Sequence, residues 1–376
     1  MKRRQYLRNS GIVGGALLST GLAGCTGDGN GNGNGNGNGN GNGNGNGGTT
    51  GSAGDELADE LTVYTNIPFD SVQEAYESSS GVDLNVVTLG GPQPNLQYVS
   101  EWEQEQYDVD VIASLDTSTW VLHERDIPAE VELDQEDIDE LWHHDGMAEA
   151  WEDAIGHDIR EVSVPHINQI GSFIYNTNAV SETPTTWDDI TGSDWESRIC
   201  TQPFTMDYVL RLMEAHFDTV EEAEQWIVDF DDNSPQYLSG GGTMVDSVLS
   251  GENDLSAYIW GMYASGPIDE GAPLDLHFPE PTGMHSQVIN VPQEAPNLET
   301  AKHFARWVGS AEGQEASQAI NGGALPAREG FGYGHDHVQQ RWDESDQTPI
   351  TITIGREDAD EYNERVEDLI GLDLTS

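Results

Sequence analysis

The chain has 376 residues and carries 68 acidic side chains against 14 lysines and arginines, which gives a formal net charge of −54 at pH 7. A surface of this sign repels the phosphates of nucleic acids and anionic lipid headgroups, so nucleic-acid binding is excluded. The hydrophobic fraction of 36% suffices for a sizeable core, and the carboxylates are dispersed rather than grouped with metal-ligand spacing. We therefore expect a globular protein with a halophile-type acidic surface and with neither metal nor cofactor.

The first 25 residues have the pattern of an export signal. A basic head that includes Arg3 and Arg4 precedes a weakly apolar run, 11–24, which is shorter than the roughly 20 apolar residues that span a bilayer. The head resembles a twin-arginine signal, and Leu22-Ala-Gly-Cys25 resembles a lipobox. This resemblance implies that Cys25 is lipidated and anchors the mature protein at the extracytoplasmic face of the cell membrane. A buried N-terminal helix is the alternative, which the many glycines disfavour.

Residues 26–58 are dominated by Gly-Asn repeats and offer almost no apolar side chain to bury. Such a segment cannot form a packed core, so we predict a disordered tether with a root-mean-square reach of roughly 30 Å. The only other cysteine, Cys200, has no partner once Cys25 is lipidated. We expect Cys200 to be a buried structural residue rather than a nucleophile.

From Asp59 onward, short apolar segments with strand character alternate with helical segments. Strands are expected at 61–64, 82–88 and 109–113, a helix begins at the capping box Ser71–Glu74, and a second helix lies near 96–106. This alternation indicates a parallel sheet whose ligand-binding edge lies at the carboxyl ends of its strands.

A second α/β block follows Arg160. Strands are expected at 170–175 and 198–203, and the capping box Thr219–Glu222 starts a helix over 220–230. Asn297 is expected to cap a further helix that carries Leu298, Ala301, Phe304, Ala305 and Val308 on one face. We predict that the chain crosses between the two blocks near 159–165 and again near 255–260.

Four landmarks occur in a recognisable order along this body. They are Leu61–Asn66, Tyr175–Asn178 with Pro184–Ile190, Gly251–Leu255, and Ala295–Ala301 with Gly309–Gln314. Over roughly residues 60–328 the chain resembles the extracellular solute-binding proteins of ABC importers, in a haloarchaeal-type lipoprotein form. Within them it looks most like the iron(III), thiamine, phosphonate and polyamine group.

The resemblance implies the type II periplasmic-binding fold, in which two α/β lobes are joined by crossing strands and clamp a ligand between them. It implies a monomer that delivers its solute to an ABC permease. Lobe 1 would comprise 59–160 with about 261–310, and lobe 2 would comprise 161–260 with about 311–372. An exported hydrolase is one alternative, but no Gly-x-Ser-x-Gly, His-Glu-x-x-His or phosphate-loop motif is present, so we expect no enzyme. A surface adhesion or scaffold lipoprotein is another, but it leaves the α/β alternation unexplained.

The candidate ligand-binding residues follow from the loops at the carboxyl ends of the strands, where free helix N–H groups, glycine-rich turns and aromatic walls meet. They are Asn66, Phe69, Gly91, Ser114, Asp116, Thr117, Thr205, Asp207, Gly241, Thr243, Tyr258 and Trp260. Since these groups include both carboxylates and helix N-termini, the ligand stays open between a polyamine or thiamine, a phosphonate or other oxyanion, and chelated iron. Direct ferric coordination is not expected, because the first loop has no histidine and Tyr258 is followed by Ile259.

Overall fold

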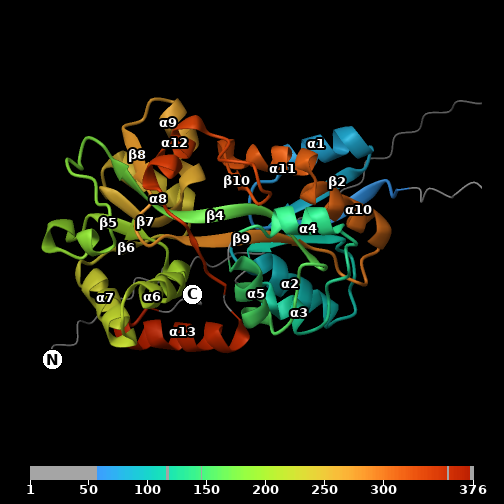
Figure 1. Cartoon of the computed structure of the whole chain (residues 1–376), viewed down its shortest axis with the longest axis horizontal. Coiled ribbons are helices and arrows are strands. Elements are labelled where there is room, and N and C mark those ends of the chain that lie inside the picture. The colour runs from blue at the N-terminus through green and yellow to red at the C-terminus, as the bar shows by residue number, and fades with distance from the viewer. Residues whose placement is uncertain (1–56, 116–117, 145, 354, 373–376) are drawn as a thin grey trace, which may run out of the picture. The chain divides into compact units, whose positions relative to one another are not determined.

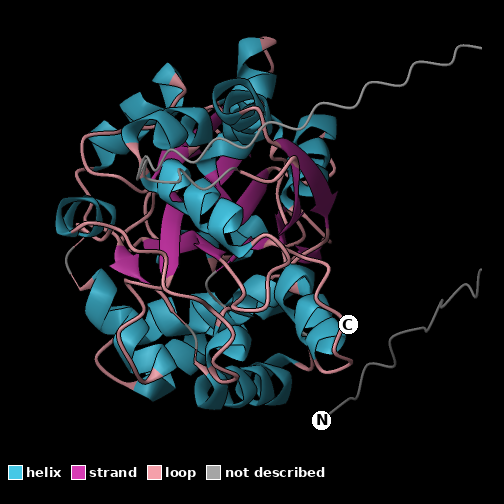
Figure 2. Ribbon diagram, turned by 90° about the vertical axis from the view of Figure 1, so that its right-hand side faces the viewer, coloured by secondary structure: helices cyan, strands magenta, loops and turns pink. Residues whose placement is uncertain are grey.

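A computed structural model describes residues 57–115, 118–144, 146–353 and 355–372 of the chain. The expected signal with Cys25, most of the expected tether, and the candidate site residues Asp116 and Thr117 lie outside the described residues. The described part is a mixed α/β structure with 13 α-helices and 11 strands, and Figure 2 shows helices on both sides of the strands.

The first half of the fold is built on three parallel strands: β1 (Glu60–Thr65), β2 (Asp83–Thr88) and β3 (Val111–Leu115). The helices that follow them are α1 (Asp70–Ser80), α2 (Gln93–Trp102), α3 (Trp120–His123), α4 (Gln135–Leu141) and α5 (Met147–Ile155). The alternation predicted from the sequence is therefore confirmed, with the third strand shifted by two residues.

The strand β4 (Ser163–Asn176) joins this half to the second and is buried along all 14 residues (Figure 1). Its first part pairs with β9 (Gly283–Asn290), and its last part pairs with β7 (Leu255–Trp260) and β8 (Leu274–His277). The first predicted crossing thus lies in β4. The second is not at 255–260, because β7 pairs with β4 and β5 inside the second half and the described chain returns through β8 and β9.

The second half contains the parallel strands β5 (Ile199–Thr201), β6 (Gln236–Tyr237) and β7. Its helices are α6 (Met206–His216), α7 (Val220–Asp232), α8 (Gly241–Ser250) and α9 (Ser265–Asp269). Short 3-10 helices occur at Asp188–Ile190, Ser193–Trp195, Pro203–Thr205, Gly261–Ala264 and Ile320–Gly322. The Thr219 hydroxyl accepts a hydrogen bond from the Glu222 amide at 3.3 Å, so the predicted capping box of α7 is confirmed.

The last elements are α10 (Leu298–Gly309), α11 (Ala311–Gln318), β10 (Leu325–Pro326), α12 (Asp336–Ser345), β11 (Ile350–Thr351) and α13 (Arg356–Ile370). They return to both halves, because α11 packs on α1 whereas α12 packs on β8. By these contacts, residues 311–318 lie with the first half and 274–277 with the second, which differs from the expected lobe boundaries.

The C-terminal segment contacts elements of both halves. On one side, the Thr353 hydroxyl donates to the Ala150 carbonyl of α5 at 2.8 Å. On the other side, the Arg211 guanidinium of α6 lies 4.6 Å from the centre of the Tyr362 ring, and Arg365 forms ion pairs with Glu214 and Glu224. Figure 1 shows α13 running below α6 and α7 toward α5.

The start of α1 differs from the prediction. The helix begins at Asp70 with Phe69 as its N-cap, and the Ser71 hydroxyl is buried without a hydrogen-bond partner among the described residues. The Phe69 ring packs against His166 and Phe304, with centroids 5.8 and 6.3 Å apart. Burial of this ring fixes the helix start, so the capping box predicted at Ser71–Glu74 is wrong.

None of the helices in the described part of the chain combines the length and the apolar composition that crossing a membrane requires.

Candidate functional site

Polar and aromatic side chains gather where β4, β7 and β9 meet. Gln169 of β4 lies opposite His285 of β9 in the antiparallel register, and Gln287 follows two residues later on the same face. Tyr208 of α6 and Tyr258 and Trp260 of β7 contact the His285 ring. We call these six residues the crossing cluster. All six are buried.

His285 is at the centre of the crossing cluster. Its Nε2 atom lies 2.6 Å from the Tyr258 hydroxyl. The Tyr208 ring packs on it with centroids 4.4 Å apart, and the Trp260 ring meets it at 61° with a separation of 5.3 Å. The second-half residues are thereby held against the strands that join the two halves.

Tyr258 has a backbone conformation that is unusual for an aromatic residue, with a φ of +53°. A side chain in this region costs on the order of 1–3 kcal/mol and persists where its surroundings over-determine it. Two glycines on the joining strands make room for the ring: a Cβ atom on Gly171 would lie 2.7 Å from Tyr258 Cε2, and one on Gly283 would lie 2.7 Å from the hydroxyl. Backbone strain of this kind is concentrated at functional sites.

The cluster contains buried polar atoms that have no hydrogen-bond partner among the described residues. They are Oε1 of Gln169 and both amide atoms of Gln287, and Nδ2 of the neighbouring Asn168 has none either. An unsatisfied buried polar group costs roughly 1–3 kcal/mol, so the partnerless atoms of Gln169 and Gln287 on one face of β4 and β9 are unusual in a folded core.

A narrow void adjoins the cluster, and Gln169 and Trp260 line it, but it has no room for a water molecule. Asn168, Met262 of the turn after β7, Leu325 of β10 and Tyr333 complete most of its wall. The Tyr333 hydroxyl is buried without a partner in the described chain, and burial raises the pKa of this phenol above its usual range. The void is thus enclosed by segments that are far apart in the sequence.

Several predicted site residues lie at or beside the crossing cluster. Tyr258 and Trp260 belong to it, and Asp207 precedes Tyr208, whose amide donates to the Asp207 carboxylate at 2.8 Å. Thr205 is fully buried just before α6, and its hydroxyl donates to the Gln202 carbonyl. From the first half, Ser114 immediately precedes Leu115, which pairs with Gln287 in the β3–β9 register. The Ser114 hydroxyl itself donates to Asn95 Oδ1 at 2.8 Å.

The other predicted residues are not brought to the cluster by any contact that we find in the described chain. Gly241 packs against the Tyr263 ring, which a Cβ would meet at 2.6 Å, and the exposed Thr243 donates to the Gly240 carbonyl. Phe69 lies in the core, and Gly91 lies in the turn after β2 with a φ of +52°. Asn66 has a buried Oδ1 without a partner within the described residues, and lies in the loop before α1.

Sequence reasoning missed Gln169, Tyr208, His285, Gln287 and Tyr333. Gln169 and Gln287 lie within strands, where a polar residue between apolar ones usually indicates a solvated face. Their burial depends on long-range pairing of β4 with β9, which no local pattern records. Tyr208 directly follows the predicted Asp207, and this proximity is the one available signal.

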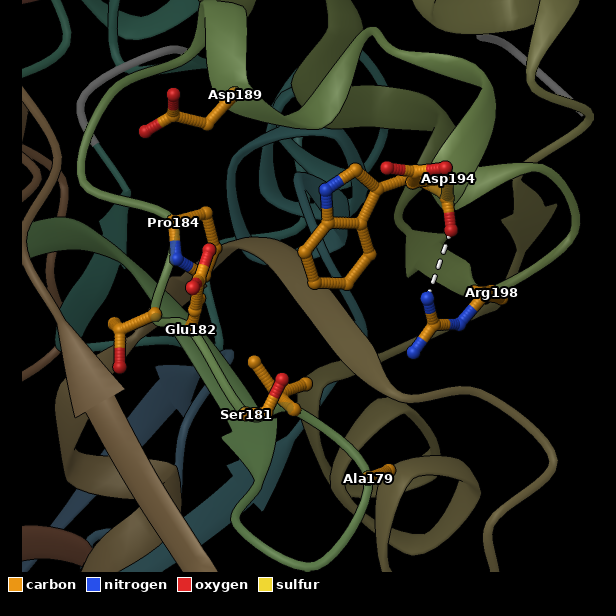
Figure 3. A pocket seen from close by; sticks show the side chains of 10 residues that line it. Ala179, Ser181, Glu182, Pro184, Asp189, Asp194 and Arg198 are labelled. Carbon is orange, nitrogen blue, oxygen red and sulfur yellow. Dashed lines mark hydrogen bonds between the residues drawn. The ribbon is translucent and has the colours of Figure 1, made fainter.

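A second pocket, of about 360 Å³, lies in the second half near the start of β5 (Figure 3). Its charged residues are already bonded to nearby groups. The Asp189 carboxylate accepts hydrogen bonds from the Thr185 and Thr186 amides, and these bonds lower the pKa of Asp189. Arg198 pairs with Asp254 and donates to the Asp194 carbonyl. This pocket contains none of the predicted site residues and none of the crossing cluster.

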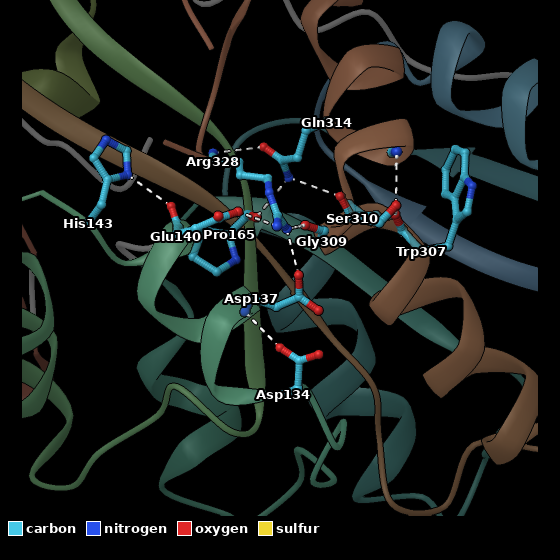
Figure 4. A network of polar contacts seen from close by, with 12 residues as sticks. Asp134, Asp137, Glu140, His143, Pro165, Trp307, Gly309, Ser310, Gln314 and Arg328 are labelled. Atoms are coloured by element: carbon cyan, nitrogen blue, oxygen red, sulfur yellow. Dashed lines mark hydrogen bonds and ion pairs between the residues drawn. The ribbon is translucent and has the colours of Figure 1, made fainter. Parts of the chain in front are cut away.

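The segment that leads from β10 to Tyr333 is fastened to the first half by Arg328 and Gln314 (Figure 4). The Arg328 guanidinium donates to Asp137 Oδ1 at 2.7 Å and to the Gly309 carbonyl at 2.8 Å, and it pairs with Glu140. Gln314 accepts the Ala327 and Arg328 amides with its Oε1 atom and donates to the Pro165 carbonyl at the start of β4. The network therefore ties the wall of the void to α4 and to β4.

No group of histidine, cysteine and carboxylate side chains with the arrangement of a metal site occurs among the described residues. Cys200 is fully buried, and burial raises the pKa of its thiol to about 12, so it is held as the neutral thiol.

The chain is similar to known proteins over most of its length. Residues 72–342 match the family model described as bacterial extracellular solute-binding protein. No curated protein matches it. Iron-bound HitA from Pseudomonas aeruginosa is similar with a TM-score of 0.66 and 18% identity, covering 83% of this chain and 99% of that one.

Two further structures give comparable values. AfuA from Actinobacillus pleuropneumoniae, with fructose-6-phosphate bound, has a TM-score of 0.59 and 17% identity, covering 84% of this chain and 97% of its own. The spermidine/putrescine transporter protein PotD from Streptococcus pneumoniae has a TM-score of 0.60 and 13% identity, and the match covers 83% of this chain and 98% of that one. At such identities the likeness shows the fold, and the type II periplasmic-binding fold predicted from the sequence is confirmed.

Proposed function

The chain belongs to the bacterial extracellular solute-binding proteins, and from this premise we propose that it captures a small solute at the crossing cluster and delivers it to an ABC permease. The observation that carries the proposal is a set of buried amide atoms without partners among the described residues, Oε1 of Gln169 and both amide atoms of Gln287, on neighbouring strands β4 and β9. Solute sites combine apolar walls with a few polar groups that orient the ligand, and a bound solute would satisfy these amides.

The position of the cluster supports capture between two walls. One wall is the carboxyl end of β3, where Leu115 pairs with Gln287; Asp116 and Thr117 come next in the sequence and lie outside the described residues. The other wall is the start of α6 with Asp207, together with the end of β7. In the proposed mechanism, ligand contacts are complete only when both walls approach, so that binding favours the approached state.

Native mass spectrometry of protein isolated in high salt tests this proposal, because it weighs the solute that co-purifies. Asp207→Ala is expected to weaken retention of that solute about 5-fold to 150-fold, the effect of removing one hydrogen bond to a desolvated ligand. The control is Thr243→Ala, which alters an exposed residue of α8 away from the cluster. Protein that carries no solute from any growth medium, or equal retention by both variants, would contradict a solute site here.

The second part of the proposal concerns location. The family places the protein outside the cytoplasm, and the pattern before Cys25 supports twin-arginine export, lipidation of Cys25 and a tether to the cell membrane. The monomeric state is part of the same proposal. It fits a surface whose strong negative charge opposes self-association.

Cys25→Ser is expected to move the protein from the membrane fraction to the medium, because the lipid would be the anchor. The matched control is Cys200→Ser, which changes the other cysteine and should leave the protein with the membrane. Immunoblots of the two fractions measure the distribution, and membrane retention of the Cys25 variant would reveal a different anchor.

A further inference from the structure

We infer that the C-terminal residues form a strap that limits how far the two halves of the protein separate. The strap comprises residues 350–353, which include β11, and residues 355–370, which include α13. The inference rests on the proposed function only in taking the two halves to move toward and away from each other. It concerns this motion and names no solute.

Thr353 is bonded to both halves at once. Its hydroxyl donates to the Ala150 carbonyl of α5 at 2.8 Å, and its own carbonyl accepts a hydrogen bond from the Arg211 guanidinium of α6. Thr353 is 5% exposed, and a buried hydrogen bond is electrostatically stronger than one in water. Because one residue makes both bonds, the strap has little slack between α5 and α6.

On either side of Thr353, the strap packs closely on β9 and on α5. The strand β11 pairs with β9 in parallel, and the Ile352 amide donates to the Met284 carbonyl at 2.9 Å. A Cβ atom on Gly355 would collide with the carbonyl oxygen of Ala154 in α5. The start of α13 therefore lies against α5 with no room for a side chain at position 355.

Charged and aromatic contacts hold the other end of the strap on α6 and α7. Arg365 forms ion pairs with Glu214 of α6 and Glu224 of α7. The Tyr362 hydroxyl donates to Glu214, and the Arg211 guanidinium packs on the Tyr362 ring. A segment that is attached to two bodies restricts their separation, so the strap opposes any motion that draws α5 away from α6.

The first test compares two threonines of the strap. Thr353→Val keeps the shape of the side chain and removes the hydroxyl that bonds Ala150. Thr351→Val is the matched control, because the Thr351 hydroxyl has no hydrogen-bond partner among the described residues. Gly355→Ala disrupts the same attachment by steric collision instead of by loss of a bond.

The second test acts at the opposite end of the strap. Arg365→Gln removes the charge that pairs with α6 and α7. Arg341→Gln is the matched control, because the partners of Arg341, which are Asp275 and Glu344, lie within the second half. A strap requires both of its attachments, so we expect disruption at either end to have the same effect on the distance between the halves.

Double electron–electron resonance measures this distance between nitroxide labels at Glu152→Cys on α5 and Glu221→Cys on α7, both exposed positions. A Cys25→Ser background restricts labelling to these two sites, because Cys200 is fully buried. We expect Thr353→Val to raise the ratio of separated to approached molecules about 2-fold to 10-fold, the effect of one intramolecular hydrogen bond. Gly355→Ala and Arg365→Gln should also raise the ratio, and both controls should match the parent protein.

Three outcomes would overturn the inference. They are unchanged distances in the test variants, a change at one end of the strap only, and equal changes in the test variants and their controls. The readout is a distance and not the retention of a solute. Failure of the strap would therefore leave the native mass spectrometry result intact, and failure to find a solute would leave the distances intact.

Discussion

The Tyr258 side chain lies so close to Gly171 and Gly283 that a side chain at either position would collide with it. The ring occupies the volume that a side chain at position 171 would need, at a backbone φ of +53°. Gly171→Ala should therefore push the ring or the joining strand aside and lower the free energy of unfolding by about 1–3 kcal/mol.

Chemical denaturation followed by tryptophan fluorescence measures the effect of Gly171→Ala. Gly242→Ala is the control, because a Cβ atom there meets nothing within 4 Å and alanine suits the helix α8. If both variants had the stability of the parent protein, the tight fit around Tyr258 would be refuted.

His166 predicts a dependence of stability on pH. Burial lowers the pKa of His166 to about 3, whereas a histidine in an unfolded chain titrates near 6.5. Between these values the unfolded state binds a proton that the folded state does not. The contribution of His166 is therefore fully present above about pH 6.5 and is lost as the pH falls toward 3, by up to about 1.4 kcal/mol per pH unit.

His166→Leu should remove this loss. Both ring nitrogens lack hydrogen-bond partners in the described chain, so the variant should match the parent protein at pH 7.5 and exceed its stability at pH 5. Unfolding free energies from urea titrations at the two pH values provide the comparison. Parallel losses in both proteins would show that His166 is not the group responsible.

At the residue scale, the sequence named two of the six cluster residues, Tyr258 and Trp260, which lie in the last half of β7. It also named Asp207, which is next to Tyr208 in the first turn of α6. Gln169 and Gln287 could not be named, because a glutamine in mid-strand is read as solvent-facing until its cross-strand partner is known.

At the scale of the elements, one arginine holds the segment around β10 against the first half. Arg328 joins Asp137, Glu140 and the Gly309 carbonyl, and its side chain is only 13% exposed. Arg328→Ala should lower the free energy of unfolding by about 1.5–3 kcal/mol, because hydrogen bonds to charged groups are lost and two carboxylates are left together.

Arg328→Lys should fall between Arg328→Ala and the parent protein, since an ammonium cannot reproduce the planar arrangement of donors. Arg125→Ala is the control: its pair with Glu103 is largely solvated and should contribute at most about 1 kcal/mol. Thermal unfolding in one buffer ranks the variants, and equal effects of Arg328→Ala and Arg125→Ala would contradict the special role of Arg328.

At the scale of the elements, a helix start that depends on local hydrogen bonds was predicted correctly, whereas a helix start that depends on tertiary packing was not. The box at Thr219 and Glu222 caps α7 as expected, whereas the equivalent pattern at Ser71 is overridden by burial of Phe69. The helix α10 has the expected buried face, but the Asn297 side chain bonds Asp110 and the Glu60 carbonyl instead of capping it. The length of β4 was underestimated because its first residues include Pro165 and polar side chains.

At the scale of the whole molecule, the charge of −54 predicts a dependence on salt. The Debye length falls from about 10 Å at 0.1 M salt to about 3 Å at 1 M, so salt removes most of the repulsion between surface carboxylates. The melting temperature should rise steeply with KCl over this range. Sucrose of equal osmolality, which is excluded from the surface but screens nothing, is the control. An equal rise in sucrose would mean that charge repulsion is not the cause.

The alternating α/β blocks predicted the architecture, but not the path by which the chain returns. The sequence indicated a crossing segment near 255–260, where β7 lies, but predicted no strand at Gly283–Asn290, where β9 lies. The return path is fixed by the pairing of β9 with both β3 and β4.

The residues after α12 lie beyond the part that matches the solute-binding family, 72–342, and they touch both halves of the protein. Any motion that separates α5 from α6 must break one of two unequal attachments. Among the described residues, the attachment to α5 includes the hydrogen bond from Thr353 to Ala150, whereas the attachment to α6 and α7 includes the ion pairs of Arg365 and the contacts of Arg211 and Arg365 with the Tyr362 ring. The attachment to α6 and α7 contains more charged contacts, so α13 would stay with α6 if α5 and α6 moved apart.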